Sequence, residues 1–294
     1  MSSTLADPST ADPSPADPSV APPSAWRSIA QQRRLMIGLV ITLLVALIAI
    51  AGPWFAPHAQ NAIVGRPFTG QGSFLGTDYL GQDVLSRLLD GGRSILVISL
   101  LATVLGLVVG VLIGLVAAYT GSWIDEAIMR LNDVALAFPQ ILLALLVLSA
   151  VDQPTWWLIV LLVGFSHAPR VARVARGVAL GLVSRDFVTA AEALGESRVR
   201  VMLAEVLPNM NAPLLAEAGL RLTYSIGMVA GIGFLGFSAN PGAADWGQMI
   251  NENRLALLVQ PWGVLAPVLV IGIFTIGTNI MADGVAQLAG RGDA

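Results

Sequence analysis

Long apolar stretches constrain this chain more than any other feature. Leu35–Gly52 and Ile95–Tyr119 contain no charged residue, and about 18 or more apolar residues in a row are enough to cross a bilayer as a helix. Only 12% of all residues are charged, compared with about 25% in soluble domains. The sequence therefore predicts an all-α integral membrane protein in a lipid bilayer.

Six transmembrane helices are expected in total. The other four predicted spans are Val134–Val151, Trp156–Phe165 with a helical continuation, Leu222–Phe237 and Trp262–Met281. Because cytoplasmic loops are enriched in basic residues, the arginines orient these spans. An N-terminus inside the cell places twelve of the sixteen arginines in the cytoplasm. Both termini are thus expected to be cytoplasmic.

The chain divides into three predicted regions. Residues 1–25 repeat Ala-Asp-Pro-Ser and are expected to form a disordered tail, because they contain few apolar side chains to bury. Residues 26–93 should hold the first transmembrane helix and an outward-facing amphipathic segment. Residues 94–288 should form a five-helix core, interrupted between its third and fourth helices by a charged cytoplasmic loop, 184–209.

This loop has the pattern of two short amphipathic helices around a glycine corner. Phe187, Ala191 and Leu194 recur at helical spacing, and Gly195 stands where helices often end in a left-handed conformation. Pro208 is expected to end the second helix. Candidate N-caps of the first helix are Ser184 and Asp186, and the apolar face of the second consists of Val199, Met202, Leu203 and Val206. The residues alone allow an interfacial loop or a docking surface for a cytoplasmic partner.

Composition excludes several classes of function. A net charge of −3 offers nothing to attract nucleic acid. There is no cysteine, and the two histidines, His58 and His167, are far apart, so no metal site is expected. The chain has no lysine and therefore no Gly-Lys-Ser/Thr phosphate loop. Any hydrolysis of ATP would take place on a separate subunit.

An ion-coupled secondary transporter is the chief rival class. Such proteins place ionisable residues at membrane depth, but every predicted span except the fourth lacks Asp, Glu, Arg and His. Glu217 and Arg221, spaced i, i+4 just before the fifth span, are expected to form an ion pair at the helix edge. The predicted spans therefore offer no buried titratable group to which ion transport could be coupled, which argues against a secondary transporter.

The loop sequence TAAEALGESRVRVMLAEVLPN resembles the EAA loop of permease subunits in ABC importers. Ala190, Ala191 and Gly195 match, as do Leu207 and Pro208 at its end. Thr189 stands where the family usually has glutamate; either Glu192, one helical turn on, supplies the carboxylate or the contact is weaker. Further segments resemble the dipeptide, oligopeptide and nickel branch: Phe74–Leu96, Gly121–Pro139, Gly233–Ile250 and Pro261–Val285.

The resemblance implies a type I ABC importer permease in the bacterial cytoplasmic membrane, a non-catalytic subunit that imports di- or oligopeptides. The expected partners are a second, similar permease, two cytoplasmic ATPase subunits or domains, and an extracytoplasmic binding protein. ATP and Mg²⁺ would bind to the ATPases, and this chain would hold no cofactor. The residues expected to couple to the ATPase are Thr189, Ala190, Ala191, Glu192, Ala193, Leu194, Gly195, Leu207 and Pro208. Nickel or another small solute is the alternative cargo.

Three further features carry expectations. Asp78 and Asp83 lie in a segment whose apolar residues, Leu80, Val84, Leu85, Leu88 and Leu89, favour a helix along the membrane surface over an acid/base pair. With Asp245, Trp246 and Glu252 of a later outer loop, they form a candidate outward-facing gate or substrate region.

Arg170, Arg173 and Arg176 lie at the inner end of the fourth span. They either anchor that end in the membrane, line the inner mouth of the pathway or face the ATPase. His167 beside them is expected to be solvated. Gly106, Gly110 and Gly114 share a helix face for close packing, within the chain or in a dimer.

Overall fold

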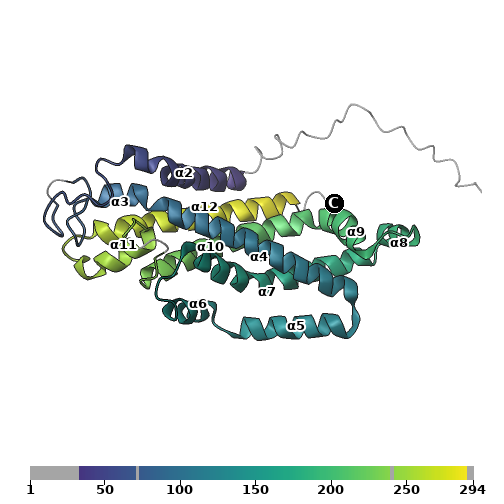
Figure 1. Ribbon diagram of the computed structural model, residues 1–294. Coiled ribbons are helices and arrows are strands. Elements are labelled where there is room, and N and C mark those ends of the chain that lie inside the picture. Colours follow the sequence, from purple (N-terminus) through teal and green to yellow (C-terminus); the bar gives the residue numbers. More distant parts are fainter. Residues whose placement is uncertain (1–32, 71–72, 239–241, 290–294) are drawn as a thin grey trace, which may run out of the picture.

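The computed structural model describes residues 33–70, 73–238 and 242–289; the predicted tail, 1–25, lies outside them. The described chain is helical apart from turns and two isolated antiparallel bridges, Ile63 with Gln82 and Thr77 with Asp83. Long helices run side by side, with the short α3 and α11 at one end of the bundle and α8 and α9 at the other (Figure 1). These two ends are called the outer and inner ends below.

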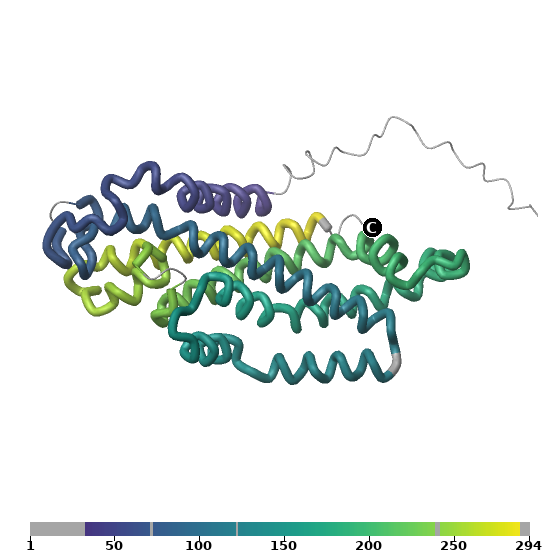
Figure 2. The backbone as a smooth tube through the Cα atoms, viewed as in Figure 1, coloured from purple at the N-terminus to yellow at the C-terminus, as the bar shows by residue number. Residues whose placement is uncertain are grey.

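The helices follow one another in a simple order. They are α2 (Arg33–Phe55), α3 (Val84–Asp90), α4 (Gly92–Thr120), α5 (Ser122–Ala137), α6 (Gln140–Ser149), α7 (Trp156–Val183), α8 (Asp186–Ala193), α9 (Arg198–Arg200), α10 (Asn211–Phe234), α11 (Trp246–Asn253) and α12 (Trp262–Ala289). Within the described ranges, four stretches are long and apolar enough to cross a membrane: α2, Val84–Thr120, α7 and α12. The start of α2 and the end of α12 lie toward the inner end (Figure 2).

The predicted third span is not a straight helix. Helices α5 and α6 meet at an angle of 75° and count as a fifth span only as a broken pair. The break falls at Phe138 and Pro139, because a residue before proline is driven out of the helical region and Phe138 has an extended backbone. The expectation of one helix over Val134–Val151 is therefore wrong.

The predicted fifth span begins earlier than expected. Helix α10 starts at Asn211 rather than Leu222 and includes Glu217 and Arg221. Its 24 residues reach about 36 Å, enough to span a bilayer, although α10 is not among the stretches that are apolar enough by composition. It packs between α4 and α12, so the two charged residues lie inside the bundle rather than at a helix edge.

The glycines of α4 pack against α7 within this chain. A Cβ added at Gly110 would lie 2.5 Å from the Cβ of Val171, and one at Gly114 would lie 2.6 Å from the carbonyl oxygen of Ala172. Neither position has room for a side chain, so the two helix backbones approach closely. The intramolecular alternative for these glycines is confirmed.

Candidate functional site

The loop at the inner end turns at Gly195, as the sequence predicts. Gly195 has a φ of +83°, a conformation that L side chains rarely adopt. Its N–H donates to the carbonyl of Glu192 over 3.0 Å, and the N–H of Glu196 donates to Ala191 over 3.2 Å. These bonds satisfy the last carbonyls of α8 and close it with a sharp corner.

The chain then stays helical into α10. Ser197 caps α9 by accepting a hydrogen bond from the N–H of Arg200, a wide turn follows over Val201–Val206, and a tight turn covers Leu207–Met210. The expected end at Pro208 is wrong. Proline has no N–H to donate to the next helical hydrogen bond. The helix is therefore wide before Pro208, over Val201–Val206, and tight around it, over Leu207–Met210, but it continues into α10.

The predicted cap of α8 is also wrong. Arg185 occupies the N-cap position without a side-chain hydrogen bond, and Ser184 lies outside the helix. Asp186 falls in the first turn, where its negative charge favours the helix through the positive end of the helix dipole.

The loop divides its apolar residues between a buried and an exposed side. Val188, Val201, Val206 and Met210 are fully buried in a cluster with α7, and Ala191 packs against them. Leu194 is 84% exposed and Val199 60% exposed. The loop therefore presents an apolar surface away from the rest of the chain, made of Phe187, Leu194, Val199 and Leu203. Exposed apolar patches of this kind mark interaction surfaces.

The predicted coupling residues lie on or next to this surface. Thr189, Ala190 and Ala193 are exposed on α8, Leu207 is half-buried and Pro208 is exposed. Glu192 accepts a hydrogen bond from the hydroxyl of Tyr119 at the inner end of α4. Glu192, which follows Thr189 by about one helical turn, is thus held against α4 by a hydrogen bond.

A buried arginine organises the outer end. Arg87 of α3 donates through Nη1 to Asp78 and to Glu252 of α11, the latter over 2.9 Å. Asp78 is fully buried and also accepts hydrogen bonds from the N–H groups of Leu80 and Gln82. Two of the five predicted outer residues, Asp78 and Glu252, are therefore brought together by an arginine that the sequence did not single out.

Asp83 has a structural role at the start of α3. It caps the helix by accepting from the N–H groups of Leu85 and Ser86. Burial alone would raise the pKa of Asp83, but hydrogen bonds from Ser73, Ser86, His58 and Leu85 outweigh it and hold the pKa below its ordinary value. Residues 74–83 form turns and bridges, and α3 leads directly into α4. The predicted helix therefore forms only over Val84–Asp90, and Asp78 and Leu80 lie outside it.

Asp245 and Trp246 are buried at the start of α11. Asp245 caps the helix through the N–H groups of Gly247 and Gln248 and accepts from the hydroxyl of Ser94 over 2.6 Å. Burial raises its pKa. The indole of Trp246 donates to the carbonyl of Leu88 over 2.7 Å. In this conformation both side chains join α11 to α3 and α4, and neither is presented to an outside molecule.

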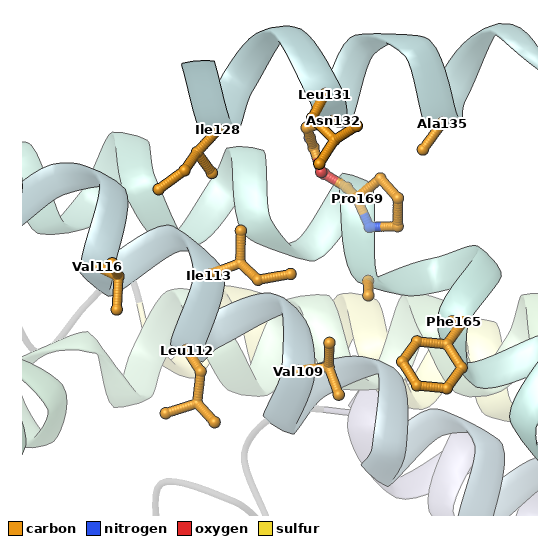
Figure 3. Close-up of a pocket in the computed structure, with 11 residues that line it drawn as sticks. Val109, Leu112, Ile113, Val116, Ile128, Leu131, Asn132, Ala135, Phe165 and Pro169 are labelled. Atoms are coloured by element: carbon orange, nitrogen blue, oxygen red, sulfur yellow. The ribbon is translucent and has the colours of Figure 1, made fainter. Parts of the chain in front are cut away.

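Helix α5 stands away from the bundle and is held by polar contacts. Arg176 donates two hydrogen bonds of 2.5 Å to Asp125, and Arg173 contacts Asp133 over 2.7 Å. Between α5, α4 and α7 lies an apolar cavity of about 540 Å³; Figure 3 shows Leu131, Ile113 and Phe165 around it. The cavity therefore separates part of α5 from α4 and α7.

Comparisons with known proteins decide the family. Residues 110–291 match the family described as binding-protein-dependent transport system inner membrane component, and residues 24–71 match the N-terminal transmembrane domain of oligopeptide transport permease C. The chain belongs to the binding-protein-dependent permeases. It is accordingly a multi-pass inner membrane protein, and the family implies ATPase and substrate-binding partners.

Relatives of this permease are similar along most of their length. It is 35% identical to the di/tripeptide transport system permease protein DppC of Pseudomonas aeruginosa, over 88% of each chain. It is 32% identical to the dipeptide transport system permease protein DppC of Haemophilus influenzae, over 88% of this chain and 91% of the other. A solved inward-facing structure of the MetNI methionine ABC transporter is similar in fold, with a TM-score of 0.54, 16% identity, and coverage of 69% of the permease and 95% of that chain.

Sequence reasoning missed several polar residues that join helices of the permease. His167 is only 1% exposed, so its predicted solvation is wrong. Its Nε2 lies 3.0 Å from the hydroxyl of Ser225, which lies 2.9 Å from that of Thr103. These three residues connect α7, α10 and α4. Asp125 and Asp133, the partners of two arginines, were missed as well; the i, i+8 spacing of two acids on α5 was the available signal.

Proposed function

We propose that this permease imports di- or oligopeptides in an ATP-driven complex, with the loop 184–209 as its docking site for a cytoplasmic ATPase. The observation that carries the proposal is the corner at Gly195, which presents exposed apolar residues at the inner end of the bundle. Both the start of α2 and the end of α12 lie toward that end. With the loop in the cytoplasm, both termini are cytoplasmic too.

The remaining partners follow from the same arrangement. The chain contributes one docking loop, so two ATPase subunits or domains need a second, similar permease beside this one. Two exposed apolar residues of α5, Trp123 and Val134, support a contact with that second permease. ATP and Mg²⁺ would bind only to the ATPases, so this subunit moves the peptide without catalysing a reaction or holding a cofactor.

The proposal that the cargo is a peptide is based on the relatives, whose names specify dipeptides or tripeptides. Nickel remains the alternative that the sequence leaves open. Proteoliposomes containing the full complex and its binding protein should take up a labelled dipeptide only when ATP is supplied. ATP-dependent uptake of nickel without any uptake of peptide would overturn the cargo.

Docking is tested by co-purification through a tag on this chain. We expect the wild type to retain the ATPase and the second permease, and Gly195→Trp to lose the ATPase, because a bulky side chain would not fit a close-fitting groove. Gly236→Trp is a matched control: Gly236 also has a positive φ, +96°, with open space around its Cβ, but lies after α10 at the outer end. Loss of the ATPase in both variants, or in neither, would contradict docking at Gly195.

A further inference from the structure

A polar cavity lies between α5, α7 and α10. Its volume is about 450 Å³, within the range of roughly 300–1,000 Å³ typical of small-molecule sites. It is lined by Leu136, Arg170, Arg173, Val174, Glu217 and Arg221. Four of these six side chains are charged, which distinguishes this cavity from the apolar one on the other side of α5.

The cavity lies beside the middle of α7. Arg170 is fourteen residues from the first residue of α7 and thirteen from the last, or roughly 20 Å from either end. Charged side chains that face lipid are costly, and on helices that cross a membrane they mark substrate pathways and sites between helices. The open side of the cavity therefore faces a water-filled path or another protein rather than lipid.

Two of the charged residues are held in place by one another. Nε of Arg221 lies 2.8 Å from Oε1 of Glu217, and each side chain is more than nine-tenths buried. The guanidinium of Arg221 also lies over the ring of Tyr224, 5.1 Å from its centroid. Arg173 is paired with Asp133 over 2.7 Å. These contacts fix one wall of the cavity before any ligand enters.

Arg170 is different from its neighbours. It is exposed and has neither an ion pair nor a hydrogen bond in the described residues. Arg221 is paired with Glu217 in the lining and Arg173 with Asp133 just outside it, so among the described residues Arg170 is left without a counter-charge. A guanidinium binds a carboxylate through two parallel hydrogen bonds, so one carboxylate group is the ligand that this cavity lacks.

We propose that the cavity is a transient binding site in which Arg170 holds the terminal carboxylate of the peptide being imported. The proposal rests on the proposed function and names a contact for its substrate. Glu217 and Asp133 act as positioning residues, because they hold the guanidinium groups of Arg221 and Arg173 and leave Arg170 free to bind the ligand.

The test compares two peptides in proteoliposomes with the full complex and saturating binding protein. One peptide has a free terminal carboxylate, and the other is a terminal amide chosen because the isolated binding protein holds it. The binding protein has the same preference between the two peptides with every permease variant. This preference therefore cancels when the ratio of free-peptide uptake to amide uptake is compared between variants. A charged hydrogen-bonded contact predicts that Arg170→Gln lowers uptake of the free peptide by roughly tenfold to a hundredfold and leaves the amide unchanged.

Two further variants sharpen the result. Arg170→Lys keeps the charge but loses the second hydrogen bond, so uptake of the free peptide should fall by less than in Arg170→Gln. Arg130→Gln removes an exposed arginine of α5 and should change neither rate. Equal loss of both peptides in Arg170→Gln, or loss of neither, would overturn the site while peptide import by the wild type stands. If the wild type imports no peptide, the proposed function fails and the site fails with it.

Discussion

The hydroxyl of Tyr119 donates a hydrogen bond to Glu192, joining the inner end of α4 to the helix that precedes the Gly195 corner. Helix α4 packs along α7, so a force on the loop reaches the bundle by two routes. One is the chain itself through α10, and the other is this side-chain contact.

Tyr119→Phe tests the second route. The substitution keeps the ring and removes only the hydrogen bond, which contributes about 1 kcal/mol to holding α8 on α4. Amide hydrogen exchange over residues 186–195 should become about fivefold faster in the purified complex, with exchange in α12 unchanged as the internal control. Unchanged exchange over 186–195 would show that Glu192 does not hold the loop.

Gly110→Ala should destabilise the permease although alanine is the better helix former. The added methyl group would lie 2.5 Å from the Cβ of Val171, and overpacking of this kind costs about 1–3 kcal/mol. Gly177→Ala is the control, because Gly177 lies in α7 with nothing within 4 Å of its Cβ. The melting temperature of the complex should fall only in the first variant; an equal response would mean that α4 and α7 can separate at no cost.

Arg87→Gln should be among the most damaging substitutions at the outer end. It leaves Asp78, which is fully buried, without its positive partner, and breaking a buried ion pair costs about 3–5 kcal/mol. Arg130→Gln removes an arginine paired with Glu126 over 3.5 Å on an exposed surface, where such pairs contribute about 0.3–0.5 kcal/mol. Chemical denaturation of the two variants side by side should separate them clearly, and similar midpoints would contradict the buried pairing.

Two buried helix caps should respond to pH in opposite directions. Burial raises the pKa of Asp245, so the stability contributed by its protonated form is present below the unfolded pKa of about 3.9 and is lost as the pH rises through the folded pKa. The pKa of Asp83 is lowered, so its contribution is present above the unfolded pKa and is lost as the pH falls through the folded pKa.

Asparagine variants measure these contributions separately. Relative to wild type, Asp245→Asn should gain in melting temperature as the pH rises from about 4 to 7, because it escapes the cost of a buried charge. Asp83→Asn should be less stable than wild type at neutral pH, and the deficit should shrink below about pH 4. If the stability difference from wild type changed with pH in the same direction for both variants, the opposite pKa shifts of Asp245 and Asp83 would be contradicted.

The local features of this permease could be read from its sequence. Apolar runs such as Ile95–Tyr119 predict helices because only a helix satisfies its own backbone hydrogen bonds in lipid. Gly195 predicts the corner because glycine alone enters the left-handed region without strain. The coupling residues proposed here come from the pattern of the EAA loop. The break at Pro139 could have been located by the rule for residues that precede proline.

Only the tertiary structure decided which residues meet across helices. Glu252 reaches Arg87 over a separation of 165 residues, and His167 is buried because α4 and α10 pack over it. Periodicity identifies which side chains share a face, but not which neighbouring helix covers that face or leaves it open. For the same reason the sequence did not predict that Arg173 and Arg176 bind carboxylates of α5 while Arg170 has no partner in the part of the chain that the structure describes. The spacing of three is the same for all of them, and the position of α5 makes the difference.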